Sequence, residues 1–150
     1  MSELDRIDHR ILHELSQSGR LPNTELAERV GLSPSACLRR VQTLARIGVI
    51  RGYKAVLDSA RLGRAFTAYI TVGLNKHTSA VQEAFEQAML AAPEVIECHN
   101  ITGAVEYLLR VEVADLVAYK AFHAETLGVL PQVNALTTFV VMASPKDLRM

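Results

Sequence analysis

With 150 residues, 49% of them hydrophobic, the chain is long enough for one medium domain or two small ones, and its balanced charge argues against disorder. No run approaches the roughly 20 apolar residues of a membrane span. The N-terminal residues contain no basic segment followed by an apolar one, so we expect no signal peptide and a cytoplasmic protein.

The net charge of zero hides an asymmetry between the two halves of the chain. Residues 1–64 hold 11 Lys and Arg against 7 Asp and Glu, a net charge of +4, whereas residues 65–150 hold 5 against 9, a net charge of −4. Residues 29–64 include eight basic residues and only one acidic residue, Asp58. A local basic zone on a neutral protein is typical of a protein that binds a polyanion.

The first two helices are expected before residue 31. Apolar residues recur at helical spacing from residue 4 to residue 15, with Asp5 as the cap, Asp8 in the first turn and Gly19 after the end. A second, shorter helix is expected to begin after Pro22, with Asn23 as its cap, and to end at Gly31.

A third helix follows after a tight turn. Ser33 is a good N-cap and Pro34 suits the first helical position, where its missing N–H costs nothing. The buried stripe is expected to contain Cys37 or Leu38, together with Val41 and Leu44 at helical spacing. Helix, helix, tight turn and helix in this order predict a helix-turn-helix.

The other face of the third helix is small near its beginning and carries two arginines one turn later. This pattern suits a helix in a DNA major groove, with first-turn residues at base edges and arginines on phosphate or guanine. The alternative is an ordinary amphipathic helix with charges in water, but the basic zone favours double-stranded DNA. The candidate contacts are Ser33, Ser35, Ala36, Arg39, Arg40, Gln42 and Thr43.

A small hairpin, or wing, is expected after the third helix. Residues 50–56 alternate apolar and polar side chains around Gly52. Arg51 and Lys54 would be available to phosphates beside the groove, although they could also only solubilise the turn. We favour phosphate contact, because half or more of protein–DNA hydrogen bonds go to phosphate and sugar.

The second half predicts a ferredoxin-like domain. Residues 58–64 are read as a connection, so the expected domains are residues 1–60 and 61–150. The strands are expected at residues 66–74, 95–101, 106–113 and 133–142. The first helix is expected to be opened by Thr78 or Ser79, and Ser79 and Gln82 have capping-box spacing. The second helix is expected to be capped by Asp115, with Leu116, Tyr119 and Phe122 facing inward. The order βαββαβ is that of a four-stranded sheet with both helices on one face, so the fold class is α+β.

The face of this sheet without helices must be covered. Thr67, Tyr69, Thr71 and their cross-strand neighbours are too apolar for an obviously solvated face. A second copy of the chain is the simplest cover, so we expect at least a homodimer.

The sequence gives little indication of a disulfide, a metal site or a catalytic site. Cys37 and Cys98 fall in different predicted domains, so each is expected to be a buried thiol. His9 and His13 have a spacing that could hold a metal, but no third ligand is evident, and we expect no metal site. No phosphate loop, nucleophile elbow or carboxylate pair with a base is present, so we do not expect an enzyme or a cofactor.

Several motifs in order resemble the Lrp/AsnC family of feast/famine transcriptional regulators. They are Leu-Asp-Arg-Ile-Asp at residues 4–8, Gly-Leu-Ser-Pro-Ser-Ala-Cys-Leu-Arg-Arg-Val at residues 31–41, Gly-Val-Ile-Arg-Gly-Tyr at residues 48–53 and Thr-Gly-Ala-Val-Glu-Tyr-Leu-Leu at residues 102–109. The similarity covers nearly the whole chain.

The resemblance implies a winged helix-turn-helix joined to a ligand-sensing domain of the RAM type, with dimers that assemble further into tetramers or octamers. It also implies a small effector, usually an amino acid, between neighbouring subunits. The family loop commonly reads Thr-Gly-Asp-x-Asp-Tyr-Leu-Leu, whereas this chain has Ala104 and Glu106 at the acidic positions. The candidate effector residues are Thr102, Gly103, Ala104, Val105, Glu106, Tyr107, Thr137 and Thr138.

Two functional hypotheses follow. The first is a sequence-specific DNA-binding transcriptional regulator that responds to an amino acid or a related metabolite. The second is an amino-acid sensor, or regulatory subunit of a metabolic enzyme, that does not bind DNA. The excess of arginine over acidic residues between residues 29 and 64 favours the first.

Overall fold

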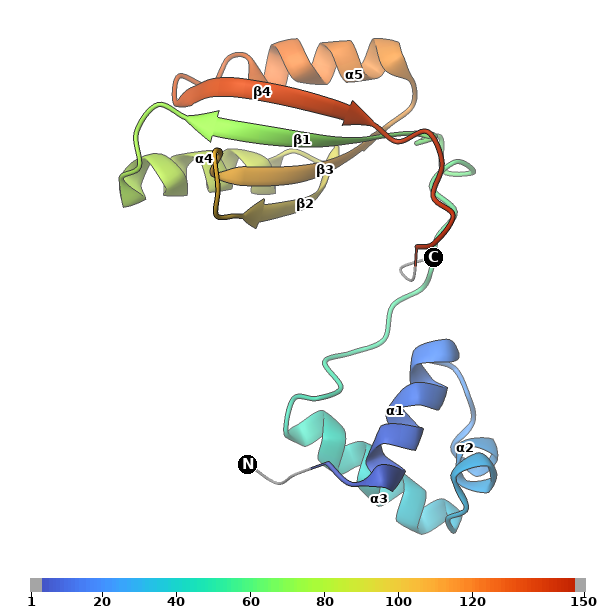
Figure 1. Cartoon of the computed structure of the whole chain (residues 1–150). Helices are drawn as coiled ribbons and strands as arrows, with labels where there is room; N and C mark the ends of the chain where they lie inside the picture. The colour runs from blue at the N-terminus through green and yellow to red at the C-terminus, as the bar shows by residue number, and fades with distance from the viewer. Residues whose placement is uncertain (1–3, 148–150) are drawn as a thin grey trace. The chain divides into compact units, whose positions relative to one another are not determined.

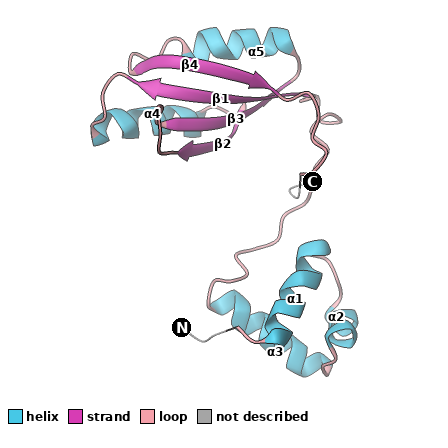
Figure 2. Ribbon diagram, in the orientation of Figure 1, coloured by secondary structure: helices cyan, strands magenta, loops and turns pink. Residues whose placement is uncertain are grey.

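The computed structural model describes residues 4–147, which belong to two compact units, Met1–Ala55 and Val56–Met150 (Figure 1). The first unit is helical and the second is a sheet with helices (Figure 2). Among residues 4–147, no helix is long and apolar enough to cross a membrane.

Within residues 4–55, the first unit contains three helices, α1 (Arg6–Gln17), α2 (Asn23–Val30) and α3 (Pro34–Arg46). The expected cap of α1 is confirmed, because the Asp5 side chain accepts hydrogen bonds from the N–H groups of Ile7 and Asp8 and a capping box is complete. The cap of α3 is also confirmed, since the Ser33 hydroxyl accepts from the Ala36 N–H.

The turn between α2 and α3 depends on Gly31. Its φ of 74° lies in the left-handed region, where glycine carries no Cβ penalty. The prediction for Asn23 was wrong: the cap is Pro22, and Asn23 is the first helical residue. Its side-chain amide instead donates to the Pro34 carbonyl oxygen at 2.8 Å, so it ties the beginning of α2 to the beginning of α3.

The core of the first unit resolves the choice between Cys37 and Leu38. Cys37 is fully buried, whereas Leu38 is exposed. The three helices enclose a small cluster whose fully or nearly fully buried members are Ile11, Leu26, Ala27, Val30, Cys37 and Leu44.

The hairpin expected over residues 50–56 is absent, and residues 51–58 run without regular secondary structure. Gly52, with a φ of 151°, interrupts regular strand geometry, and both Tyr53 and Val56 are exposed. Two short strands with no further strand or helix against them are marginally stable in water. The helix-turn-helix is therefore present without a wing.

The second unit contains a four-stranded antiparallel sheet in the order β2-β3-β1-β4, and the predicted α+β arrangement is confirmed. The elements are β1 (Phe66–Leu74), α4 (Ser79–Ala91), β2 (Val95–Asn100), β3 (Tyr107–Val113), α5 (Leu116–Phe122), a π-helical turn (His123–Leu127) and β4 (Val133–Val140).

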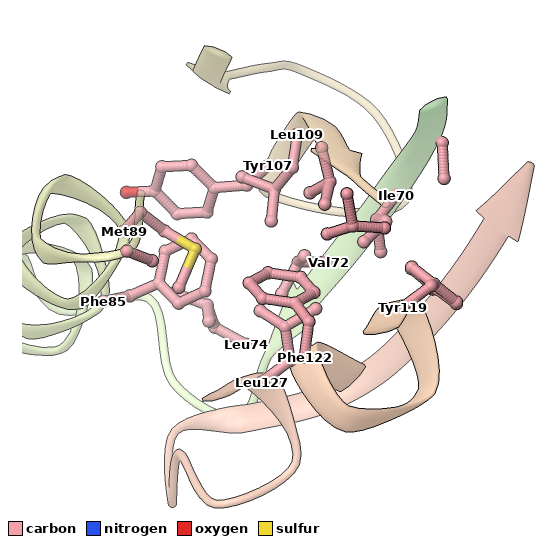
Figure 3. Close-up of a cluster of buried hydrophobic side chains, with 14 residues drawn as sticks. Ile70, Val72, Leu74, Phe85, Met89, Tyr107, Leu109, Tyr119, Phe122 and Leu127 are labelled. Atoms are coloured by element: carbon pink, nitrogen blue, oxygen red, sulfur yellow. The ribbon is translucent and has the colours of Figure 1, made fainter. Parts of the chain in front are cut away.

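Both helices pack on one face of the sheet. Ile70 and Val72, two residues apart on β1, share a core with Phe85 of α4 and Phe122 of α5 (Figure 3). Tyr107 of β3 lies in the same core, with its ring centroid 4.7 Å from that of Phe85.

Three local expectations in this unit were wrong. Thr78 is the N-cap of α4 and makes no side-chain cap bond, so the capping box from Ser79 to Gln82 does not form. Leu116, the first residue of α5, is exposed rather than inward-facing. Cys98 lies on β2, an edge strand of the sheet, and is exposed rather than buried.

In the described part of the second unit, residues 56–147, the opposite face of the sheet carries no helix. Tyr69 lies opposite Phe139 on β4 and Arg110 on β3, and Thr71 lies opposite Thr137 and Leu108. Phe139 is 55% exposed. We call this surface the open sheet face.

Candidate DNA and effector sites

The exposed side of α3 presents a polar row of side chains, which we call the outer stripe. Ser35, Arg39, Gln42 and Thr43 are all exposed, as predicted from the helical spacing. The row also includes Arg46, which is not among the DNA contacts expected from the sequence. Its position seven residues after Arg39 was a sufficient signal, because seven residues are about two helical turns.

The two adjacent arginines have different environments. Among residues 4–147, no ion pair or side-chain hydrogen bond involves the Arg39 guanidinium, which is exposed. The Arg40 guanidinium lies 2.7 Å from Asp5 Oδ2 and 2.8 Å from Asp8 Oδ1. Consecutive helical residues point about 100° apart, so only one of the two arginines can be centred on the outer stripe.

The remaining candidate DNA contacts lie at the two ends of α3. Ser33 is exposed and caps the helix, while Ala36 is half-buried one turn later. Arg51 and Lys54 are exposed in the extended segment after α3. These positions leave Arg51 and Lys54 free to meet phosphates, but without a hairpin to hold them.

The candidate effector loop, residues 101–106, joins β2 to β3. The Ile101 N–H donates to the Glu106 carbonyl oxygen at 2.8 Å and closes the loop, while Gly103 adopts a φ of 126°. Thr102, Gly103 and Ala104 are exposed, and Val105 is half-buried. The exposed part of the loop therefore offers backbone groups and the Thr102 hydroxyl.

Tyr107, the last candidate of this run, points into the core. Its side chain is 1% exposed, and its hydroxyl donates to Glu86 Oε1 at 2.6 Å. Burial, followed by the hydrogen bond to the Glu86 carboxylate, raises the pKa of Tyr107 to about 12. Its ring and hydroxyl are thus committed to internal contacts.

Thr137 and Thr138 cannot serve one ligand together. Successive strand residues point to opposite faces. Thr137 is exposed on the open sheet face opposite Thr71, whereas the Thr138 hydroxyl is hydrogen-bonded to the Tyr119 hydroxyl under α5.

Glu106 is the acidic residue of the loop, and its carboxylate is already engaged. Glu106 Oε2 accepts a hydrogen bond from the Leu74 N–H at 2.6 Å, and Oε1 lies 3.0 Å from Nδ1 of His77. The Glu106 side chain is 16% exposed. The carboxylate therefore fastens the loop to the end of β1.

Replacing Glu106 by alanine is expected to lower the free energy of unfolding of the second unit by about 1–3 kcal/mol, because the N–H of the buried Leu74 loses its acceptor. Glu106→Gln is the matched control, since it keeps an oxygen for that N–H and loses only the charge. Urea denaturation followed by circular dichroism measures both. Equal losses in the two variants would mean that the charge facing His77, and not the acceptor, matters.

The thiols do not suggest nucleophilic chemistry. Burial raises the pKa of Cys37, and desolvation raises the pKa of Cys98 to about 11, so both thiols are protonated at neutral pH. In the part of the chain that the structure describes, no group of three or more His, Cys, Asp or Glu side chains could hold a metal ion.

Known protein families match both units. Residues 4–45 match the AsnC-type helix-turn-helix domain, and residues 67–150 match the Lrp/AsnC ligand binding domain. The leucine-responsive regulatory protein of Escherichia coli K12 is 44% identical over 145 residues, which are 97% of this chain and 88% of that protein.

Solved structures give the same result. A transcriptional regulator of Neisseria meningitidis, crystallised in complex with L-methionine, superposes with a TM-score of 0.93 at 36% identity, covering 97% of this chain and 94% of that one. An AsnC family transcriptional regulator from Agrobacterium tumefaciens has a TM-score of 0.90 at 32% identity, covering 96% and 94%.

A helix-turn-helix that exposes the outer stripe of α3, joined to a ferredoxin-like sensing domain, defines a ligand-responsive DNA-binding transcriptional regulator. This chain belongs to the Lrp/AsnC family of transcriptional regulators.

Proposed function

We propose that this regulator reads duplex DNA with the outer stripe of α3 and changes its affinity when a free amino acid binds to the second unit. The observation that carries the first part is the exposed guanidinium of Arg39, which lies among small and polar neighbours and has no ion-pair or side-chain hydrogen-bond partner among residues 4–147. Arg39 reaches guanine or phosphate, Gln42 and Thr43 lie beside it, and Arg46 extends the contact along the helix.

A homodimer supplies two such helices to one duplex. The open sheet face carries Tyr69 and the 55% exposed Phe139 on neighbouring strands, an apolar surface that a second copy would cover. Paired recognition helices then meet successive major grooves about one helical turn apart. Dimers assemble further into tetramers or octamers, and the protein acts in the cytoplasm.

The effector proposal rests on the loop and on the relative crystallised with L-methionine. The loop backbone around Gly103 offers N–H groups to a ligand carboxylate, and the Thr102 hydroxyl and Ala104 flank it. Because Glu106 is turned toward Leu74 and His77, the ligand's ammonium group must find its partner outside this loop. Thr137, exposed on the open sheet face, is the better placed of the two threonines.

The test begins with selection of duplexes by the wild-type protein from a random-sequence pool. We expect enrichment of a sequence with two related half-sites and a mass in solution of at least a dimer. L-methionine and L-leucine are then titrated with and without the selected duplex. A shift in DNA affinity must be matched by an equal shift in ligand affinity, commonly by ~1–3 kcal/mol.

Each part of this proposal can fail separately. No enriched sequence would reject DNA recognition, and a monomer would reject the paired arrangement. Equal ligand affinity with and without the duplex would reject the regulatory coupling.

A further inference from the structure

Arg40 is a second arginine on the DNA-binding helix, but its guanidinium is paired with carboxylates of the same domain. Its guanidinium Nη1 lies 2.7 Å from Asp5 Oδ2 and 2.8 Å from Asp8 Oδ1, and its side chain is 33% exposed. Both carboxylates belong to the beginning of α1, more than thirty residues earlier in the chain. The contact therefore joins α3 to the N-terminal end of α1.

The helix cap orients both carboxylates through hydrogen bonds to backbone N–H groups. Asp5 Oδ1 accepts the N–H groups of Ile7 and Asp8 at 2.8 and 2.9 Å, which leaves Oδ2 for Arg40. Asp8 Oδ2 accepts the Asp5 N–H at 3.2 Å, which leaves Oδ1 for Arg40. Each carboxylate thus uses one oxygen for the helix cap and the other for the guanidinium.

This arrangement differs from an ordinary surface ion pair. Exposed pairs contribute little, mainly because two flexible side chains must be ordered. Here the cap already orders both carboxylates, so only the arginine loses freedom on pairing. The N–H of Asp8 first, and then Arg40, hold the pKa of Asp5 below its usual range, which keeps this carboxylate charged.

We propose that Arg40 is a positioning residue that clamps α3 to the beginning of α1 and so sets the direction in which the outer stripe faces DNA. This inference rests on the proposed DNA-binding role of α3, and it revises the sequence-based expectation that Arg40 itself contacts DNA. Arg39 contacts the duplex, while Arg40 contacts Asp5 and Asp8 and keeps Arg39 in place.

Four single variants and one double variant separate the two roles. Arg40→Gln removes the clamp from α3, and Asp8→Asn removes a charged partner while leaving an oxygen for the Asp5 N–H. Their double variant tests coupling. Arg39→Gln is the control for a lost DNA contact, and Glu28→Gln, which removes an exposed carboxylate of the same unit, is the control for charge.

Binding is measured against a duplex selected by the wild-type protein and against a scrambled duplex of the same composition, at several salt concentrations. We expect Arg40→Gln and Asp8→Asn each to weaken binding to the selected duplex about tenfold, and the double variant to lose no more than either single one. Their salt slopes should equal that of the wild type. If Arg39 contacts phosphate, Arg39→Gln should reduce the slope by about 0.9, the value for one lost phosphate contact. If Arg39 reads guanine, Arg39→Gln should weaken binding to the selected duplex and relax the preference at that base pair.

The contrary results are specific. If Arg40 contacts phosphate, Arg40→Gln lowers the salt slope by about 0.9, and Asp8→Asn, like Glu28→Gln, binds at least as tightly as the wild type. Unchanged affinity of Arg40→Gln, measured where circular dichroism shows it folded, would leave the clamp with no role in recognition. If Arg40→Gln does not fold, the comparison of Asp8→Asn with Glu28→Gln decides: weaker binding to the selected duplex by Asp8→Asn alone supports the clamp, and equal binding by the two variants contradicts it. If the wild type selects no duplex, the proposed DNA binding fails, and the positioning role falls with it.

Discussion

Replacing Phe85 by alanine is expected to lower the free energy of unfolding of the second unit by about 3–5 kcal/mol. Phe85 is fully buried between the sheet and α4, and its ring contacts that of Tyr107 (Figure 3). Removing the ring both loses the transfer free energy of a large apolar group and leaves a cavity that rigid strands cannot close. Urea denaturation monitored by circular dichroism provides the measurement.

Leu90→Ala is the matched control for this prediction. Leu90 lies on the same helix but is 79% exposed, so its truncation should change the free energy of unfolding by at most about 0.5 kcal/mol. A loss from Phe85→Ala as small as that from Leu90→Ala would mean that α4 does not pack on the sheet.

Replacing Arg39 by alanine is expected to weaken binding to the selected duplex by about 1–3 kcal/mol if the guanidinium reads a base, and to relax the preference at that base pair. If it contacts phosphate instead, binding should weaken on all sequences and the salt slope should fall by about 0.9. In both cases the stability of the first unit should change little, because the guanidinium has no ion-pair or hydrogen-bond partner among residues 4–147.

The charge control for Arg39→Ala is Lys120→Ala. It removes the same charge from an exposed position on α5, in the other unit. Titrations of the selected and scrambled duplexes at several salt concentrations distinguish the outcomes. An equal loss of affinity in the two variants would indicate that net charge, rather than the outer stripe, sets DNA binding.

Together these features separate the two tasks of the chain. The first unit is a small three-helix domain whose outer stripe is available to a duplex. The second unit has a large core under one sheet face and leaves the other face, and the exposed loop at residues 102–104, available to partners. Binding and regulation are thereby placed on separate units of one chain.

The sequence by itself determined those features that arise from contacts within a few residues. The caps by Asp5, Ser33 and Asp115 depend on side chains that bond to backbone two or three residues onward, and all three are present. The period-two alternation of β1 and the left-handed turn at Gly31 are equally local. Local rules were not complete, because Asn23 and Ser79 have suitable side chains but do not cap.

Only the tertiary structure decided which polar side chains remain available for function. Arg40 and Arg39 are the same residue type at adjacent positions, yet partners at Asp5 and Asp8 engage only Arg40. Glu106 meets the Leu74 N–H across 32 positions of the chain, and Tyr107 meets Glu86 across 21. Composition and spacing do not predict such partners, because hydrogen bonds and ion pairs between distant residues depend on how helices and strands pack.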